Sequence, residues 1–333
     1  MPASSSSRRT SSPNTAGRSR RLRQTRRRVS LDNLCHTLVG AALGEAGLKR
    51  RTPLGSATLM IASNLPDVDV LVFASTTPSV AFRRGWTHGV LADLLLPVML
   101  TGIIVFAARR RVDVRPRQIL ALSYIGVILH VLMDLLNNYG VRLLMPFSQH
   151  WFYGDVLFII DPWLWIVLGA GIWLARQRRS AKPARGALLL AAVYVAVMIV
   201  SARAARAEIV DRWQQVEGTP PRALMVGPVP VTPLRRQVII DAGDRYETGT
   251  LTWRPRSVRF DVPDVPKNGA DPRVAVASEA PNIRAFLVWS RFPFWTIEPV
   301  PGGARVSVGD MRFAGGPGGL ARNFTQSAIV RGP

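Results

Sequence analysis

Two side chains that can bind a metal ion lie within a long apolar stretch of the chain. His130 and Asp134 are four residues apart in the run from Ile119 to Leu136. On an α-helix this spacing places both on one face, about one turn apart. Ionisable groups at membrane depth are costly, and they normally line an interior cavity or act directly in function. The spacing predicts a chelating pair, and the alternative is a hydrogen-bonded pair that holds helices together.

Two further carboxylates, Asp67 and Asp69, follow one another closely in a turn. They belong to residues 64–69 (Asn-Leu-Pro-Asp-Val-Asp), which end a short apolar segment and in which Pro66 stiffens the chain. Asp and Asn are also common in turns for purely structural reasons. The motif taken alone therefore leaves open whether it is a plain turn or a pair of ligands.

Histidines also stand at the start of two other apolar segments. His88 ends residues 83–88 (Arg-Arg-Gly-Trp-Thr-His), and His36 lies in residues 32–37 (Asp-Asn-Leu-Cys-His-Thr). A lone histidine at a helix start is commonly a cap or an interfacial residue. The guanidinium groups of Arg83 and Arg84 suit either a phosphate or an anionic lipid head group.

Imidazole and carboxylate groups without thiolates suit Zn, Mn or Fe. The chain has one cysteine, Cys35, which excludes both an internal disulfide framework and a thiolate cluster. Five or six such ligands exceed the needs of one open tetrahedral site, so one or two ions are expected. A catalytic ion activates water and polarises a phosphoryl or acyl oxygen, which makes hydrolysis the natural reaction. The common nucleophile-elbow, Walker and dinucleotide motifs do not occur.

Long apolar helices are the elements that must position these groups. The chain of 333 residues is 48% hydrophobic, yet it carries 43 Lys and Arg against 21 Asp and Glu, a formal net charge of +22. Charge is therefore segregated from the apolar runs, as in a membrane protein. Four runs have about membrane-spanning length, and two shorter ones predict a helical hairpin packed inside the bundle. The long runs are Gly89–Ala108, Ile119–Leu136, Phe158–Ala175 and Gly186–Ala202, and the short ones are Asn33–Leu48 and Pro53–Ser63.

Basic residues alternate between the loops and indicate the orientation of these segments. Clusters at 49–51, 109–117 and 176–185 are expected inside, because Lys and Arg in short loops favour the cytoplasm. The loops at 64–88 and 137–157 are poor in basic residues and are expected outside. Six crossings then bring three of the four histidines and at least three aspartates to the outer membrane face. The fourth, His150, is expected to be a surface residue.

The two ends of the chain differ from this helical region. Residues 1–30 form an Arg- and Ser-rich tail that is expected to be disordered. Its alternatives are an arm for nucleic acid or anionic lipid, or a misread start codon at Val29. Residues 206–333 show strand-like alternation, as at 236–240, 250–253, 286–289 and 305–308, and lack histidine. They predict a small β domain that acts as a lid or substrate guide, or that binds a partner.

The motifs of residues 31–205 together resemble the YdjM-like family of membrane-bound, metal-dependent hydrolases of bacterial inner membranes. The resemblance rests on four motifs: Asp-Asn-x-x-His-Thr at 32–37, Asn-x-Pro-Asp-x-Asp at 64–69, Arg-x-x-Thr-His at 84–88 and His-x-x-x-Asp at 130–134. The apolar runs, the loop charges and the strand-like pattern after residue 206 predict a mainly α fold, a polytopic bundle of four long and two short helices, followed by a small extracytoplasmic β domain. The resemblance implies a multi-pass protein of the bacterial inner membrane, and the loop charges predict that its active face is extracytoplasmic.

The order of these residues is also distantly similar to that of zinc-dependent phospholipase C. That likeness implies a divalent ion, foremost zinc, with Mn or Fe as alternatives. The implied metal ligands are His36, Asp67, Asp69, His88, His130 and Asp134. Asp67, Asp69, His130 and Asp134 are further predicted to be catalytic, and Arg83, Arg84 and Asn64 to bind substrate. Asp155 and Asp161 are expected as helix caps or as supports of the ligands, and Trp151, Trp163 and Trp165 as an interfacial belt.

Two hypotheses about function follow. The first is an integral membrane hydrolase that acts on a phosphoester or a lipid-linked substrate through metal-activated water. The second is a non-enzymatic membrane scaffold or binding protein with a structural His/Asp metal site. The lipid bilayer is the expected partner in both, and nucleic acid is not expected because only the tail suggests it.

Overall fold

The computed structural model describes residues 32–74, 82–314 and 324–331. The predicted tail, residues 1–30, lies outside the described residues, as does the alternative of a start at Val29. The described elements belong to one unit that spans Leu31–Pro333.

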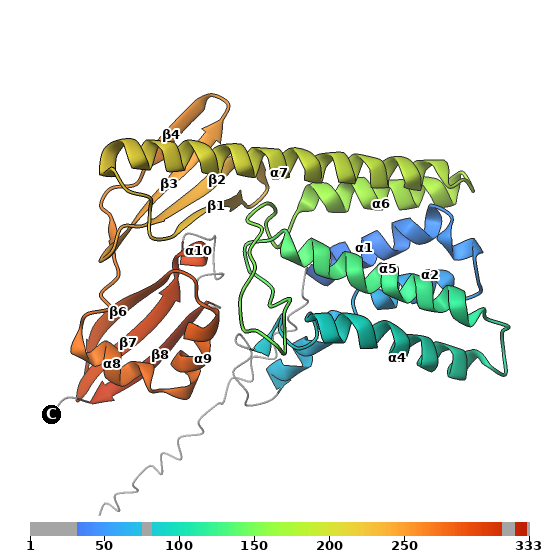
Figure 1. Ribbon diagram of the computed structural model, residues 1–333, viewed down its shortest axis with the longest axis horizontal. Coiled ribbons are helices and arrows are strands. Elements are labelled where there is room, and N and C mark those ends of the chain that lie inside the picture. The colour runs from blue at the N-terminus through green and yellow to red at the C-terminus, as the bar shows by residue number, and fades with distance from the viewer. Residues whose placement is uncertain (1–31, 75–81, 315–323, 332–333) are drawn as a thin grey trace, which may run out of the picture. The chain divides into compact units, whose positions relative to one another are not determined.

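Helices make up the first part of the described chain, in agreement with the sequence (Figure 1). Three of them, α5, α6 and α7, have a proline in the first turn, where its missing N–H breaks no helical hydrogen bond. At α6 the carboxylate of Asp161 also accepts hydrogen bonds from the backbone N–H groups of Trp163 and Leu164, so its predicted role as a cap is confirmed. The elements are α1 (Asp32–Glu45), η1 (Leu48–Arg50), α2 (Gly55–Ala62), η2 (Pro66–Ala74), α4 (Val90–Ala108), α5 (Pro116–Leu135), α6 (Pro162–Gln177) and α7 (Lys182–Glu217).

Three of the described helices, α4, α5 and α7, are long and apolar enough to cross a membrane. Helix α6 has 16 residues, about 24 Å at 1.5 Å per residue, which is shorter than a hydrocarbon core of about 30 Å. Helix α7 has 36 residues and continues through Ala205, where the sequence predicted the helical region to end. The boundary predicted between residues 205 and 206 therefore falls inside a helix.

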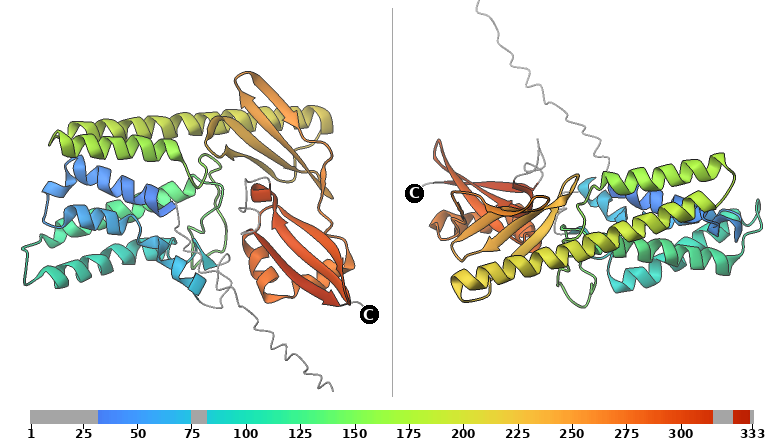
Figure 2. Two further views of the ribbon diagram at one scale, coloured as in Figure 1. Left: turned by 180° about the vertical axis from the view of Figure 1, so that it is seen from behind. Right: turned by 90° about the horizontal axis from the view of Figure 1, so that it is seen from above.

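The short helices α1 and α2 pack closely within the bundle, as the sequence predicted. A Cβ atom on Gly40 of α1 would lie 2.8 Å from the carbonyl oxygen of Leu59 in α2. On its other side α1 shares a buried core with α6, formed by Ala41, Ala42, Leu168 and Ile172. The left view in Figure 2 shows these helices running alongside one another.

An antiparallel sheet follows α7 and packs on its C-terminal half. The strand order is β1-β2-β3-β4, and β5 pairs with β3. Ala205 and Ile209 of α7 share a buried core with Val226, Val238 and Leu251 of the sheet, and in Figure 1 α7 extends along these strands. The strands are β1 (Leu224–Val229), β2 (Thr232–Asp241), β3 (Arg245–Trp253), β4 (Arg256–Phe260) and β5 (Val265–Pro266).

A second antiparallel sheet, of order β6-β7-β8, completes the described chain. Residues 286–289 do not form the predicted strand but end α9. Pro281 opens this helix, and its buried residues Ile283, Phe286 and Trp289 recur every three positions, which is close to the helical period. The other predicted strand segments lie in β2, β3 and β7. The elements are α8 (Pro272–Ser278), α9 (Pro281–Trp289), β6 (Pro293–Val300), β7 (Gly303–Asp310), α10 (Met311–Ala314) and β8 (Thr325–Arg331).

Candidate metal centre

Four separate segments bring the predicted ligands together. His36 lies in α1, Asp67 and Asp69 lie at the start of η2, and His88 lies in the loop that precedes α4. His130 and Asp134 occupy the end of α5, on one face as their spacing predicts. All six side chains are buried. The convergence that the sequence suggested is therefore present in the fold.

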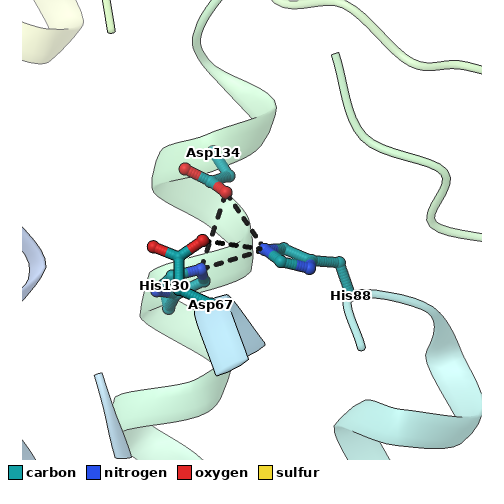
Figure 3. Close-up of side chains that lie close together, drawn as sticks. All are labelled: Asp67, His88, His130 and Asp134. Atoms are coloured by element: carbon teal, nitrogen blue, oxygen red, sulfur yellow. Dashed lines mark hydrogen bonds and ion pairs between the residues drawn. The ribbon is translucent and has the colours of Figure 1, made fainter. Parts of the chain in front are cut away.

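Asp67, His88, His130 and Asp134 could hold a metal ion, because one ligand atom from each lies within 4.8 Å of the others. Figure 3 shows the four side chains pointing toward one another. The Nε2 atom of His88 is 3.1 Å from Nε2 of His130 and 3.2 Å from Oδ2 of Asp134. It is 3.9 Å from Oδ1 of Asp67. Bonds of about 2.1 Å to a tetrahedral ion require ligand atoms about 3.4 Å apart, so these spacings fit such an ion.

The protonation of His130 also suits a metal ligand. Its Nδ1 atom lies 2.8 Å from the carbonyl oxygen of Ser63. Because a carbonyl oxygen can only accept, Nδ1 carries a proton, and Nε2 is the ring nitrogen that faces the cluster. Metal-binding histidines are oriented in this way by a hydrogen bond on the other ring nitrogen.

His36 adjoins the group of four without belonging to it. Its Nε2 atom is 3.3 Å from Oδ1 of Asp134, and its ring lies over that of His130 with the centroids 3.9 Å apart. His36 is thus close enough to bind a second ion or to bind Asp134 directly. Its assignment as a ligand stays a prediction.

Asp69 contacts the loop that carries His88, through both backbone and side-chain atoms of that loop. Its Oδ2 atom accepts hydrogen bonds from the backbone N–H of Arg84 at 2.7 Å and from the hydroxyl of Thr87 at 3.3 Å. The Nδ1 atom of His88 lies 3.7 Å from the same oxygen. Asp69 therefore holds the loop that presents His88, and its predicted roles as ligand and catalyst stay predictions.

The two arginines beside the centre pair with its carboxylates. Nη2 of Arg83 donates to Oδ1 of Asp67 at 2.7 Å, and Nη2 of Arg84 donates to Oδ1 of Asp134 at 3.0 Å. Burial raises the pKa of Asp67, but attraction to His130, Arg83 and His88 outweighs it and holds that pKa below its usual value. Burial likewise opposes the charge of Arg83, yet Asp67 and Asp69 raise its pKa.

Arg84 is the more strongly held of the two arginines. It is 2% exposed and adopts a φ of 52°, a left-handed conformation that costs energy for a residue with a side chain. Nη1 of Arg84 also donates to the side-chain oxygen of Asn137 at 2.8 Å. Asn64, the third predicted substrate residue, donates from its amide to Oγ1 of Thr37 and to the carbonyl of Met60. These contacts join α1 to α2, and the three substrate assignments stay predictions.

Several other predicted residues lie away from the centre. His150 is exposed, as expected. Asp155 forms an ion pair with Arg291 of the C-terminal region, 2.9 Å apart. The indole N–H of Trp151 donates to the carbonyl of Val288, so this tryptophan contacts protein atoms. Trp163 is 45% exposed, in keeping with an interfacial position.

Asn137 and Tyr139 were not among the predicted site residues, although both contribute here. Asn137 lies one turn beyond Asp134 and binds Arg84, and the ring of Tyr139 lies 4.8 Å from the same guanidinium group. The helical spacing from Asp134 could have identified Asn137. The carbonyl of Ser63 could not have been found, because a backbone atom leaves no signal in the residue type.

A small cavity of about 20 Å³ opens beside the centre. His36, Asp134 and Asn137 form its polar side, and Met133, Leu157 and Leu164 form part of its apolar side. This volume has room for about one water molecule. The cavity could supply this water to the centre.

Comparisons with known proteins agree with this picture of a membrane protein. The sequence model of a family described as YdjM inner membrane protein matches residues 31–205. An uncharacterized protein of Bacillus subtilis (strain 168), YfhP, is 28% identical over 158 residues, which cover 44% of this chain and 47% of that protein. The chain thus spans about half the length of this relative. No solved structure matches, and the comparisons give no support to the likeness to zinc-dependent phospholipase C.

Proposed function

The chain belongs to the YdjM inner membrane protein family, and we propose that it is a metal-dependent hydrolase. Its substrate in this proposal is a phosphoester, either free or part of a lipid-linked molecule. The observation that carries the proposal is the meeting of Asp67, His88, His130 and Asp134 at the spacing of metal ligands. The orientation of His130 by the carbonyl of Ser63 supports it.

Asp67, His88, His130 and Asp134 would hold the ion, and His36 stands beside them. A bound zinc ion, or manganese or iron, would supply a Lewis acid that lowers the pKa of water and polarises the ester. The donor set contains only nitrogen and oxygen atoms, which suits all three metals. With His36 Nε2 only 3.3 Å from Oδ1 of Asp134, these two residues would hold a second ion if one binds.

The charges of the centre favour an anionic substrate. Asp67, Asp69 and Asp134 contribute three negative charges, and Arg83 and Arg84 contribute two positive ones. With neutral histidines this group of buried residues carries one net negative charge, which is costly to bury without a counter-ion. One divalent ion reverses the sign to one net positive charge. A phosphoester anion suits that field better than a neutral ester does.

Asp67 is the residue best placed to accept a proton during hydrolysis. Its Oδ1 atom accepts from Arg83, whereas its Oδ2 atom is buried and receives no hydrogen bond from the described residues. In this proposal Oδ2 takes the proton of the attacking water as the water oxygen bonds to phosphorus. It then gives that proton to the ester oxygen, which leaves as an alcohol when its P–O bond breaks. Asp69 keeps His88 in position, and Arg83 or Arg84 exchanges part of its contact with a carboxylate for the phosphate oxygens.

The contacts of Arg84 favour a second candidate, a membrane scaffold with a structural metal site. Arg84 joins the loop before α4 to Asp134 and Asn137 of another segment. Such a cross-link would stabilise the bundle whether or not any reaction occurs. The two functions predict different consequences when a ligand is removed.

Metal analysis and phosphate-release assays on the full-length protein in detergent test both functions. After loading with zinc, manganese or iron, the enzyme should hydrolyse a synthetic phosphodiester or a phospholipid in mixed micelles. His130→Ala should lose the metal and the turnover while remaining folded, and His150→Ala, which changes an exposed histidine, should keep both. A scaffold would instead show no turnover and a marked fall in thermal stability for His130→Ala. Wild-type protein that holds no metal and binds none would refute both functions.

We also propose that the centre and the C-terminal region face outward, because the basic clusters at 49–51, 109–117 and 176–185 favour the cytoplasm. A cysteine placed at His150 should react with a membrane-impermeant maleimide in spheroplasts, and one at Asp113 should not. The native Cys35 is buried and should give little background. Labelling with the opposite preference would contradict this orientation.

A further inference from the structure

The loop after α5 inserts an aromatic side chain into the core of the C-terminal region. Tyr139 is 6% exposed and belongs to a buried cluster that includes Phe286, Trp289, Val306 and Phe313. Its ring lies against that of Trp289, with the centroids 4.9 Å apart. The second sheet and its helices are therefore packed around a residue that lies only five positions after Asp134.

The backbone of the same loop is held by two side chains of the C-terminal region. Nη1 of Arg312 donates to the carbonyl of Asn138 at 2.9 Å, and the indole N–H of Trp289 donates to the carbonyl of Tyr139 at 3.1 Å. Arg312 is fixed in turn by Asp310, whose two carboxylate oxygens accept from Nε at 2.8 Å and from Nη2 at 2.9 Å. This ion pair is fully buried, so its geometry leaves Arg312 little freedom.

The other side of the loop contacts the metal centre. The side-chain oxygen of Asn137 accepts from the backbone N–H of Tyr139 and from Nη1 of Arg84, both at 2.8 Å. The guanidinium group of Arg84 lies over the Tyr139 ring and donates to Asp134. One short segment thus touches the C-terminal core on one side and Arg84 on the other.

We propose that the C-terminal region is a structural part of the metal centre, with Arg312 and Trp289 as positioning residues. Arg312 and Trp289 hold the backbone of Asn138 and Tyr139, and the position of Tyr139 in turn fixes the side chain of Asn137. Asn137 then holds Arg84, which is bonded to Asp134. The region is then neither a detachable lid nor only a partner-binding module. The effect on metal binding rests on the proposed function, whereas the contacts themselves can be tested without metal.

Hydrogen exchange on the full-length, metal-free protein tests the contacts directly. Arg312→Met should raise exchange in peptides that cover 134–141 and also 82–88, because Arg312 is linked to the latter through Tyr139 and Asn137. The N–H of Arg84, which donates to Asp69, is the critical reporter. Arg291→Met is the matched control, because Arg291 also crosses to the helical region but binds Asp155 instead. Increased exchange confined to 138–141, or equal effects of the two variants, would overturn the proposal.

Titration with Co²⁺ tests the consequence for the centre. Arg312→Met should weaken Co²⁺ binding by about tenfold, as is typical when a support of a metal ligand is removed, and should change the visible d–d spectrum. Arg291→Met should leave both unchanged. Trp289→Phe, which keeps one aromatic ring but removes the indole N–H donor and part of the buried ring volume, should give a smaller change and serves if Arg312→Met fails to fold. If the wild-type protein binds no Co²⁺, the proposed function fails. If Arg312→Met and Trp289→Phe both keep the wild-type spectrum and Co²⁺ affinity, only the positioning role is refuted.

Discussion

At the scale of single residues, the centre depends on buried charges that are neutralised in pairs. Asp67 is matched with Arg83 and Asp134 with Arg84, and all of these side chains are at most 13% exposed. Removing one partner from a buried ion pair is far more costly than removing an exposed one, because the remaining charge stays out of water. The arginines therefore have a structural role in addition to any contact with substrate.

Replacing Arg84 should accordingly destabilise the protein much more than replacing an exposed arginine. We expect Arg84→Met to lower the free energy of unfolding by about 3–5 kcal/mol, because Asp134 and Asn137 lose a buried partner. Arg305→Met removes an exposed, long ion pair to Glu298 and should change it by less than about 1 kcal/mol. Denaturant unfolding in detergent provides the comparison, and losses of similar size would show that Arg84 is not a buried structural charge.

At the scale of elements, close helix contacts set the distance between the ligands. Helix α5 carries His130 and Asp134, and it approaches α2 at Gly126. A Cβ atom there would lie 2.5 Å from Cβ of Ala62 and 3.0 Å from the backbone nitrogen of Ser63. Ser63 in turn provides the carbonyl that orients His130. The absence of a side chain at residue 126 therefore matters for the centre as well as for packing.

We expect Gly126→Ala to cost about 1–3 kcal/mol of stability through overpacking and to weaken Zn²⁺ binding, because α5 must move away from Ser63. Gly102→Ala in α4 is the matched control, since a Cβ there would have no atom within 4 Å. That change should be neutral or stabilising by about 0.5–1 kcal/mol, the usual preference of a helix for alanine. Thermal unfolding and metal titration of both variants measure the difference. If Gly126→Ala is destabilised but binds Zn²⁺ as tightly as the wild type, the helix contact at Gly126 does not set the distance between the ligands.

At the scale of the whole molecule, the helical and C-terminal regions share cores and hydrogen bonds. Helix α7 is common to both, since its C-terminal half packs on the first sheet. The buried pair of Asp310 and Arg312 adds the link to Asn138 and Tyr139. Stability of the two regions should therefore be coupled through groups that titrate.

Acid should weaken this link. Burial raises the pKa of Asp310, but Arg312 and the hydrogen bonds from Arg312 and Ser290 outweigh it and hold that pKa below its usual value. A depressed pKa in the folded state means that the stabilisation is fully present above the ordinary pKa of about 4 and is lost as the pH falls through the lower folded value. Asp310→Asn should cost about 3–5 kcal/mol near pH 7.

Denaturant unfolding of the wild type and Asp310→Asn across pH 2–7 measures this effect. The difference in the free energy of unfolding should shrink below about pH 4, because the Asp310 carboxylate then begins to bind a proton in the unfolded wild type while it stays charged in the folded protein. Asp244→Asn, which changes an exposed ion-paired aspartate, is the control. A difference that stays constant or grows in acid would contradict the assignment.

Motifs and apolar length were enough to predict most of the helical region and the residues of the centre. His130 and Asp134 could be paired because the helical period places residues four apart on one face. The apolar runs predicted the helices because few other structures bury a run of that length in lipid. The helix at 286–289 was missed because four apolar residues in a row fit a strand and a helix equally well.

Residue types and their period were enough to identify the side chains that can bind a metal and the long apolar helices that carry them, because both are local properties of the chain. The packing of the folded chain was needed to show that four of those ligands meet within 4.8 Å while His36 and Asp69 lie beside them. It also decided that Asn137 and Tyr139 join the centre to the C-terminal core. Such contacts depend on which distant segments pack together, and no local pattern of residues records that.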